Sequence, residues 1–382
     1  MSLLPEEIQR YRRHLSLRGF GPAAQERLKA STVLVIGAGG LGCPALLYLA
    51  AAGVGRLVVM DDDRVEVSNL QRQVLYTAAD AGRPKAEAAA DRLLALNPLI
   101  SVEPHAERLT RANALARVAD CDVVLDGTDN FATRYLVNDA CVIAGKPFVY
   151  GAIHAFEGQL SVFNWRGGPS YRCLFPAPPA ADAVPNCAEA GVLGVLPGLI
   201  GTAQAAEVIK LLTGIGTPLS GRILLWNALT METRIMRLRA VPANLALREL
   251  GADEPAACRI QERTTPSPAQ AGAAAGGPRE IRVGELRALL AAGPAPQLVD
   301  VREAWERAEG TLAGSVHVPL GVLGTAEAGP LLAGLDPLAP TVVFCAGGVR
   351  SLRALPLLEN RHGFRRPTSL AGGYQAWTAL QH

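Results

Sequence analysis

Hydrophobic and polar positions along the chain switch between the period of a strand and the period of a helix. Continuous apolar runs rich in β-branched residues occur at 32–36, 56–60 and 121–127, and each is typical of a buried strand. Between them, residues 43–52 and 85–96 have the spacing of helices. This alternation predicts βαβ units and a mostly parallel sheet.

Further strands are expected at 147–150, 158–164 and 222–226, with a further helix at 201–213. We therefore predict a first α/β domain over residues 1–239, of the Rossmann-like kind that binds nucleotides.

The composition changes after this first domain. Residues 240–277 include TTPSPAQAGAAAGGP, which holds too few large apolar residues to form a core, so we predict a flexible linker. The runs PQLVDVRE and TVVFCAGG and a helix-patterned segment at 351–358 then resume the alternation. They predict a second, small α/β domain over residues 278–382.

Composition and charge exclude several classes of protein. The 382 residues are 49% hydrophobic and 19% charged, which excludes wholesale disorder. A net charge of +2 gives no strong field, so neither nucleic acid nor a membrane is expected as a partner. The uncharged stretch 30–55 is interrupted by glycines and Pro44, and we interpret it as strand, turn and helix rather than a membrane span. Seven scattered cysteines and the absence of a signal-peptide pattern predict reduced thiols and a cytoplasmic protein.

The motif GAGGLG at 37–42 follows a predicted strand and opens a predicted helix, and Asp61 lies at the end of the next strand. Glycines permit a tight turn, free N–H groups at a helix start attract phosphate, and an acidic side chain can bind ribose hydroxyls. This motif fits either a dinucleotide or a mononucleotide.

The segment DDDRVEVSNLQRQ adds Asn69 and Arg72, and Lys85 lies at the expected start of a helix. Such cations can neutralise a triphosphate and the charge that develops as pyrophosphate leaves. The alternative is that these are ordinary solvated side chains.

A third strand ends in LDGTDN, which brings Asp126 and Asp129 to the carboxyl edge of the sheet, where such folds bind ligands. A carboxylate there can hold Mg²⁺ beside phosphates. Helix capping by Asp129 or Asn130 is the alternative.

Two cysteines lie in segments that suit a reactive thiol. In VVFCAGGVRS, Cys345 ends a strand and enters a glycine-containing loop before a helix, so backbone N–H groups can stabilise its thiolate or persulfide. The expected persulfide loop comprises Cys345, Ala346, Gly347, Gly348, Val349 and Arg350. In VPNCAEAGVLG, Cys187 precedes a predicted helix. A buried, inert cysteine is the alternative in both cases.

These motifs occur together with RYRRHLSLRGFG, EGQ, YRCLFP and CAEAGVLG in one order, and residues 5–239 thereby resemble the MoeB/ThiF branch of the ubiquitin-activating enzyme superfamily. The resemblance implies that MgATP is used to adenylate the C-terminal Gly-Gly carboxylate of a ubiquitin-like sulfur-carrier protein. It places Gly40 against the phosphates, Asp61 on the ribose and Asp129 on Mg²⁺. The ATP-binding residues expected from it are Gly40, Asp61, Asp63, Ser68, Asn69, Arg72, Lys85, Asp129 and Asn130.

The same resemblance implies roles for two further residues, and the sequence departs from the family pattern at one place. Arg13 matches an arginine that reaches the neighbouring subunit's ATP site, which implies a homodimer. Cys187 matches the cysteine that captures the activated carboxyl group as a thioester or acyl disulfide. The two CxxC pairs that often hold zinc in this family are reduced to Ser170 and Cys173, with Cys258 alone beyond them. We therefore predict no structural zinc, and a buried or bystander thiol at Cys173.

Residues 278–382 resemble a rhodanese domain through LVDVRE, GSVHVP, CAGGVRS and LAGGYQAW. The resemblance implies that Cys345 carries sulfane sulfur as a persulfide. Asp300 and Arg302 are expected to support the loop, and His317 is expected to be structural.

Together the two resemblances imply an adenylyltransferase and sulfurtransferase that produces a carrier thiocarboxylate. The sulfur donor is expected to be thiosulfate or a cysteine-desulfurase persulfide. One alternative is adenylation alone, with a docking or regulatory rhodanese domain; another is a non-catalytic dinucleotide-binding sensor. The carrier and its pathway stay open among molybdenum cofactor, thiamine, tRNA thiolation and sulfur-containing metabolites.

Overall fold

The structure is a computed structural model that describes residues 2–178, 191–251 and 279–379. The chain divides into two compact units, residues 1–264 and 265–382. Cys187, Cys258 and most of the expected linker lie outside the described residues, so the predictions for them stay predictions.

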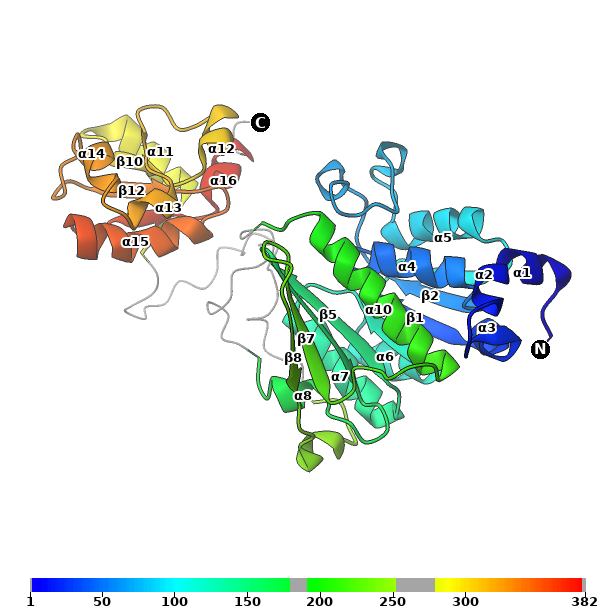
Figure 1. Cartoon of the computed structure of the whole chain (residues 1–382). Coiled ribbons are helices and arrows are strands. Elements are labelled where there is room, and N and C mark those ends of the chain that lie inside the picture. Colours follow the sequence, from blue (N-terminus) through cyan, green and yellow to red (C-terminus); the bar gives the residue numbers. More distant parts are fainter. Residues whose placement is uncertain (1, 179–190, 252–278, 380–382) are drawn as a thin grey trace. The chain divides into compact units, whose positions relative to one another are not determined.

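The first unit is built on an eight-stranded sheet with the order β3-β2-β1-β4-β5-β6-β7-β8 (Figure 1). The first five strands in that order are parallel, and the last three join them in antiparallel pairs. The strands are β1 (Thr32–Ile36), β2 (Arg56–Met60), β3 (Ser101–His105), β4 (Val123–Asp126), β5 (Phe148–His154), β6 (Glu157–Phe163), β7 (Arg222–Asn227) and β8 (Thr233–Arg237).

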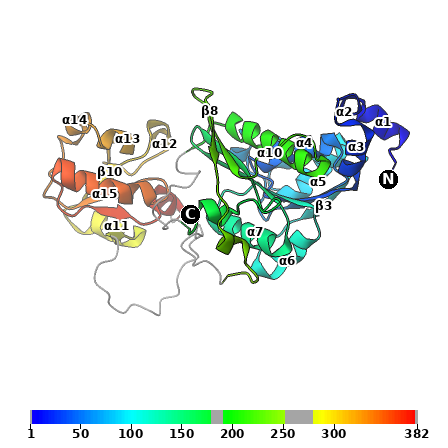
Figure 2. The same ribbon diagram turned by 60° about the horizontal axis from the view of Figure 1, so that its bottom comes forward.

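Helices cover both faces of this sheet (Figure 2). Those on one face are α3 (Gly21–Ala30), α4 (Gly42–Ala52), α5 (Lys85–Leu96) and α10 (Val195–Thr213). The opposite face carries α6 (Arg111–Ala119) and α7 (Phe131–Ala144). The chain begins with α1 (Pro5–Arg10) and α2 (Arg12–Leu15), and short turns are α8 (Tyr171–Leu174), η1 (Val67–Asn69), η2 (Ala78–Asp80) and η3 (Pro242–Leu245).

Alternation within each strand divides the apolar side chains between two cores. In β1, Val33 and Val35 pack with α4 and α10, whereas Leu34 and Ile36 pack with α6 and α7. A strand that is buried on both faces needs apolar residues at every position, which is why its sequence reads as a continuous run. The predicted α/β fold class is confirmed for this unit.

The helix α10 is long and apolar enough to cross a membrane by length and composition, with a mean hydropathy of 1.3. Half of that segment is buried inside the unit, where α10 packs on α4, β5 and β6. A helix at the centre of a soluble core has the same composition, so this observation is weak support for a membrane span. The helix begins at Val195, earlier than the predicted Gly201.

The second unit is a five-stranded parallel sheet with the order β11-β10-β12-β13-β9. Its strands are β9 (Glu280–Ile281), β10 (Gln297–Asp300), β11 (Val316–His317), β12 (Thr341–Phe344) and β13 (Thr368–Leu370). Its helices are α11 (Val283–Ala292), α12 (Ala304–Ala308), α13 (Leu320–Leu323), α14 (Ala328–Leu332), α15 (Val349–His362) and α16 (Gly373–Ala379). Two apolar cores again line the two faces of the sheet, and Cys345 belongs to one of them.

Candidate functional site

The glycine turn after β1 closes against the turn after β4. Gly37 has a φ of +90°, and a Cβ at this position would lie 2.9 Å from the carbonyl carbon of Gly127. A Cβ on Gly42 would overlap the carbonyl oxygen of Gly37. The glycines therefore let the start of α4 fold tightly onto the ends of the strands. This point lies between the neighbouring strands β1 and β4, where the strand order reverses and open α/β sheets bind their ligands.

Asp61 follows β2 directly and points its carboxylate into the glycine turn. Its Oδ2 accepts a hydrogen bond from the Ala38 N–H at 2.7 Å, and its Oδ1 accepts one from the Asp63 N–H at 2.8 Å. Burial raises the pKa of Asp61, while the positive charge of Lys85 and these N–H groups oppose the shift. The side chain is thus held in one orientation, with further lone pairs to accept hydrogen bonds from hydroxyl groups.

Lys85 begins α5 and lies beside the same turn. Its side chain is almost wholly buried, and its Nζ lies 2.7 Å from Asp63 Oδ2. The hydroxyl of Tyr76 lies 2.8 Å from the carbonyl oxygen of Ala38 and 3.2 Å from that of Lys85, so its one proton can be shared between them. This hydroxyl ties the glycine turn to the start of α5, and so fixes the ammonium group relative to the turn.

Arg72 approaches the glycine turn from the segment after η1. The carbonyl oxygen of Asn69 accepts the N–H groups of Arg72 and Gln73, both at 3.0 Å, which folds the segment back on itself. A Cβ on Gly40 would lie 3.7 Å from Arg72 Cδ, so the arginine stem runs alongside the turn. Its Nη1 makes one long bond, at 3.3 Å, to the Ser68 carbonyl oxygen. The guanidinium keeps donors for an anionic ligand.

Asp126 and Asp129 have different environments at the end of β4. Asp126 is fully buried, and its Oδ1 accepts the N–H and the hydroxyl of Thr128 at 2.9 and 2.7 Å. Asp129 is exposed and makes no hydrogen bond to another described residue. Asn130 caps α7 by accepting the Thr133 N–H at 2.9 Å. The capping alternative is therefore realised by Asn130, and Asp129 is left available to a ligand.

Arg134, which no sequence motif predicted as a site residue, organises this corner from inside α7. Its Nη2 donates to the Thr128 carbonyl oxygen at 2.7 Å, and its Nε lies 3.7 Å from Asp126 Oδ2. The guanidinium also lies over the Tyr150 ring, 5.4 Å from its centroid. Burial raises the pKa of Asp126, and the positive charge of Arg134 opposes this rise. The available signal was an arginine inside a predominantly apolar stretch of the chain, next to the run YLV.

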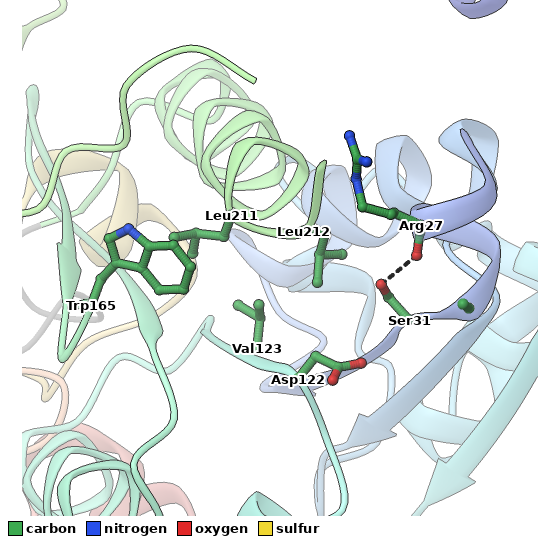
Figure 3. A pocket seen from close by; sticks show the side chains of 8 residues that line it. Arg27, Ser31, Asp122, Val123, Trp165, Leu211 and Leu212 are labelled. Atoms are coloured by element: carbon green, nitrogen blue, oxygen red, sulfur yellow. Dashed lines mark hydrogen bonds between the residues drawn. The ribbon is translucent and has the colours of Figure 1, made fainter. Parts of the chain in front are cut away.

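Two expected site residues are not joined to this corner within one chain. Arg13 lies exposed on α2 and makes no hydrogen bond to another described residue. Cys187 lies outside the described residues. The hollow of about 430 Å³ in Figure 3 is at the opposite edge of the sheet, where Ser31 and Asp122 precede β1 and β4. It does not contribute to the site.

Cys173 lies at the incomplete CxxC position, where we predicted no structural zinc. Its sulfur accepts the N–H groups of Ser170 and Val241, at 3.3 and 3.2 Å. Burial alone would raise the pKa of this thiol, but these hydrogen bonds, with one from the Ser170 hydroxyl, lower it. The thiol is partly exposed, not buried as one of our alternatives had it. The described residues contain no group of three or more His, Cys, Asp or Glu side chains arranged for a metal.

In the second unit, Cys345 follows β12 and begins a loop that wraps around its own sulfur. The Gly348 N–H donates to Sγ at 3.1 Å, and the Ser351 hydroxyl lies 3.5 Å from it. Gly348 has a φ of +96°, which turns its N–H inward. The thiol itself is buried, whereas Gly347 and Val349 are exposed at the rim.

The start of α16 clamps this loop from behind. The N–H groups of Tyr374 and Gln375 donate to the carbonyl oxygens of Cys345 and Ala346, at 2.8 and 3.0 Å. A Cβ on Gly373 would overlap both carbonyl oxygens, so the LAGGYQAW motif needs a glycine here. The motif therefore supports the loop backbone that surrounds the sulfur.

Asp300 and Arg302 support the same loop, as expected. Arg302 Nη2 donates to Asp300 Oδ2 at 2.7 Å, and its guanidinium lies 4.2 Å from the centroid of the Tyr374 ring. His317 Nε2 lies 2.8 Å from the Arg302 carbonyl oxygen. Burial would raise the pKa of Asp300, but the hydrogen bonds from Arg302 and Thr311 lower it. Asp300 and Arg302 are buried, and the partly buried His317 holds the backbone of Arg302.

Comparison with known proteins gives the family. The ThiF family model matches residues 11–246, and the rhodanese-like domain model matches residues 282–380. The chain belongs to the ThiF family. The two expected family resemblances are thereby confirmed.

Individual relatives of known description support the same family assignment. The probable adenylyltransferase/sulfurtransferase MoeZ of Mycobacterium tuberculosis is 44% identical over 381 residues, which are 98% of this chain and 94% of that protein. A sulfur carrier protein adenylyltransferase of Thermus thermophilus is 56% identical over 242 residues, 62% of this chain and 89% of its own. This ThiF family member is an adenylyltransferase and sulfurtransferase.

Among solved structures, MccB of E. coli with MccA-N7isoAsn has a TM-score of 0.56 at 23% identity, covering 63% of this chain and 74% of that one. MccB has also been solved with ATP, at a TM-score of 0.52 and 23% identity, over 58% and 67% of the two chains. At this identity the likeness concerns the fold alone.

Proposed function

We propose that the first unit uses MgATP to adenylate the C-terminal Gly-Gly carboxylate of a ubiquitin-like sulfur-carrier protein. The observation that carries the proposal is the convergence of Asp61, Lys85 and Arg72 around one glycine turn, against which Gly127 and Thr128, just before Asp129, also pack. A carboxylate is a poor electrophile, and forming a mixed anhydride with AMP gives it a good leaving group. Cations placed at the triphosphate stabilise the pyrophosphate charge as it develops, so no side-chain nucleophile is needed.

The residues at the end of β4 fit a magnesium ion that also binds the nucleotide. Mg²⁺ is commonly held by one or two carboxylates together with substrate phosphates and waters. Asp129 offers an exposed carboxylate, whereas both buried oxygens of Asp126 face Thr128 and Arg134. When bound, the ion would neutralise phosphate charge. In the protein, Arg134 and Thr128 hold the turn that presents Asp129.

An apolar surface beside this corner suits the docking of a folded carrier protein. Its exposed side chains are Phe156, Leu193, Val195, Leu229 and Met231. The segments that carry them are joined by hydrogen bonds from the Ala228 N–H to the Phe156 carbonyl oxygen and from the Leu193 N–H to the Ala155 carbonyl oxygen. Exposed apolar groups that cluster in this way mark interaction sites. β5 ends beside this surface, at the same sheet edge as Asp126, so a docked carrier could extend its tail toward the nucleotide.

We further propose that the rhodanese unit supplies the sulfur. The terminal sulfur of a Cys345 persulfide attacks the carbonyl carbon of the acyl-adenylate, a C–S bond forms, and the C–O bond to AMP breaks. The Cys187 thiolate then attacks the Cys345 sulfur of the acyl disulfide, which releases the carrier thiocarboxylate and leaves a Cys187–Cys345 disulfide for an external thiol to reduce. The buried Sγ, surrounded by the Gly348 N–H and the Ser351 hydroxyl, supports the persulfide role.

The proposal includes a cytoplasmic homodimer in which Arg13 completes the neighbouring ATP site. Its exposure on α2 supports this, because an arginine that makes no hydrogen bond to another described residue of its own chain is available to the neighbouring one. The sulfur donor is proposed to be thiosulfate or a cysteine-desulfurase persulfide.

Mass spectrometry of a candidate carrier, incubated with the full chain, MgATP and a sulfur donor, tests the whole scheme. A gain of about 16 Da is expected as sulfur replaces a carboxyl oxygen. An adenylylated carrier that never gains sulfur would favour adenylation alone, with a docking or regulatory second unit. A chain that consumes no ATP with any Gly-Gly carrier would refute the proposal.

A further inference from the structure

The cation of the persulfide loop is already paired. Arg350 donates through Nη1 and Nη2 to the two carboxylate oxygens of Glu306, at 2.7 and 2.6 Å. The two side chains are 21% and 10% exposed. A bidentate, largely buried pair of this kind is among the strongest side-chain contacts in proteins. The loop therefore presents a neutral pair where its sequence suggests a free positive charge.

Glu306 is fixed in place on both sides. Its Oε2 also accepts the Glu303 N–H at 2.8 Å, which caps α12. Its carbonyl oxygen accepts from Arg302 Nη1 at 3.2 Å, and Arg302 is itself bound to Asp300. The Arg350 hydrogen bonds lower the pKa of Glu306, and the same pair raises the pKa of Arg350. Both groups are therefore charged at neutral pH, and the carboxylate cannot swing away without breaking several contacts.

We infer that Glu306 is a specificity residue for the sulfur donor, because it cancels the charge of Arg350 beside Cys345 and so disfavours doubly charged donors. This inference rests on the proposed role of Cys345 in sulfur transfer. An unpaired guanidinium would attract a dianion about twice as strongly as a monoanion, whereas a neutral pair attracts neither appreciably.

The net charge of the Arg350–Glu306 pair should affect the reaction in which a donor transfers sulfur to Cys345, called loading below. With thiosulfate, the Cys345 thiolate attacks the outer sulfur, a new S–S bond forms, and the old S–S bond breaks so that sulfite leaves with the electron pair. Methanethiosulfonate reacts in the same way and releases methanesulfinate. The two donors transfer the same sulfur, but thiosulfate carries two negative charges and methanethiosulfonate carries one.

The test compares Glu306→Gln with the wild-type full chain, using both donors and cyanide as the acceptor. Glutamine can still accept the Glu303 N–H and one Arg350 N–H, so the cap is kept while the charge is removed. The KM for thiosulfate should fall roughly three- to tenfold at low salt, and the KM for methanethiosulfonate should fall clearly less. The gain should shrink at about 0.5 M salt.

Two variants control the interpretation. Glu309→Gln removes a charge from the same helix without touching Arg350 and should change the donor preference little. Glu306→Gln combined with Arg350→Gln should lose the thiosulfate gain, because the unmasked cation is gone. Equal KM values in wild type and Glu306→Gln for both donors, or an equal gain with both, would overturn the inference.

If the Glu306→Gln variant forms no Cys345 persulfide even at saturating donor, a second measurement on the wild-type chain still tests the inference. A masked cation predicts that the ratio of the two KM values hardly changes between about 20 mM and about 0.5 M salt. A thiosulfate KM that rises steeply with salt would contradict it. Failure of the proposed function looks different: no donor would load Cys345 in wild type, as judged by mass spectrometry of the persulfide.

Discussion

The two reactive corners of the molecule are built at the same kind of place and by different means. Each lies where a parallel strand, β1 or β12, ends in a glycine turn that leads into a helix, α4 or α15. Around the first turn, charged side chains from several segments converge, including Asp61, Arg72 and Lys85. Around the second turn, the Gly348 N–H and the Ser351 hydroxyl lie against a buried sulfur, and the cation Arg350 is paired.

This difference follows the chemistry. A triphosphate carries several charges spread over a long ligand, so a binding site for it needs cations from distant parts of the chain. A sulfur anion carries one charge on one atom, and a single loop of N–H dipoles can surround it. Apart from replacement of the reactive thiol itself, side-chain substitutions should therefore affect the first corner most, and backbone substitutions should affect the second.

Replacing the thiol should have the largest effect. Cys345→Ala should abolish thiocarboxylate formation, because no other described cysteine occupies that loop, while carrier-dependent exchange between ATP and pyrophosphate continues. The mass of the carrier measures thiocarboxylate formation, and the rate of exchange between ATP and pyrophosphate measures adenylation. Unchanged sulfur transfer in this variant would contradict the route through Cys345, and Cys43→Ala is a control at a buried cysteine of the first unit.

Removing one cation from the first corner should come next. Arg72→Ala should lower the exchange rate between ATP and pyrophosphate by about 10²- to 10³-fold, because the guanidinium lies beside the glycine turn. Arg64→Ala provides the control, since Arg64 lies in the same segment but bonds to the Gly82 carbonyl oxygen. Persulfide loading of Cys345 should not change in either variant. An Arg72→Ala enzyme with normal exchange would remove this arginine from the catalytic residues.

Arg134→Met should destabilise the first unit by about 3–5 kcal/mol, because it leaves the buried carboxylate of Asp126 without its ionic partner. Urea unfolding monitored in the full chain measures the change. Adding Asp126→Asn should recover part of the loss, since the unpaired charge is then removed. A single variant as stable as wild type would show that the pair does not hold the turn before Asp129.

Gly373→Ala should disturb the second corner through the backbone. An added Cβ would overlap the Cys345 and Ala346 carbonyl oxygens, so we expect a loss of about 1–3 kcal/mol and slower persulfide loading. Gly363→Ala is the matched control, because Gly363 also has a positive φ, +73°, but its Cβ would meet nothing within 4 Å. Equal loading rates in the two variants would mean that only backbone strain matters.

The smallest effect concerns acid stability near the first corner. Hydrogen bonds from Thr77 and Arg92 outweigh the effect of burial and lower the pKa of Asp80 to about 2, from a usual value of 3.8. A lowered folded-state pKa gives stability that is present above pH 3.8 and is lost as the pH falls toward 2. Asp80→Asn should flatten the fall in unfolding free energy over that interval. An unchanged acid profile would contradict this account.

Much of the fold could be predicted from sequence, because buried parallel strands and the helices between them have distinct periods. The runs at β1, β2 and β4 and the helix α5 were identified near their observed ends. β3 was not predicted, because its sequence SVEPH is largely polar. The strand lies at the edge of the sheet and is only partly buried, so it does not need a continuous apolar run. The early start of α10 at Val195 was missed because glycines surround it.

By itself, the sequence determined the residue types and the local turns: the glycine turn after β1, the acid after β2 and the cysteine loop after β12. These follow from short-range sterics and from periodicity, which neighbouring residues carry. Only the tertiary structure decided which charges are paired and which are available. Arg134 lies against Asp126, Glu306 neutralises Arg350, and Asp129 makes no hydrogen bond to another described residue, since Asn130 caps the helix. Such pairings join segments that the chain brings together only on folding, and the strength of each depends on burial and distance that no local pattern encodes.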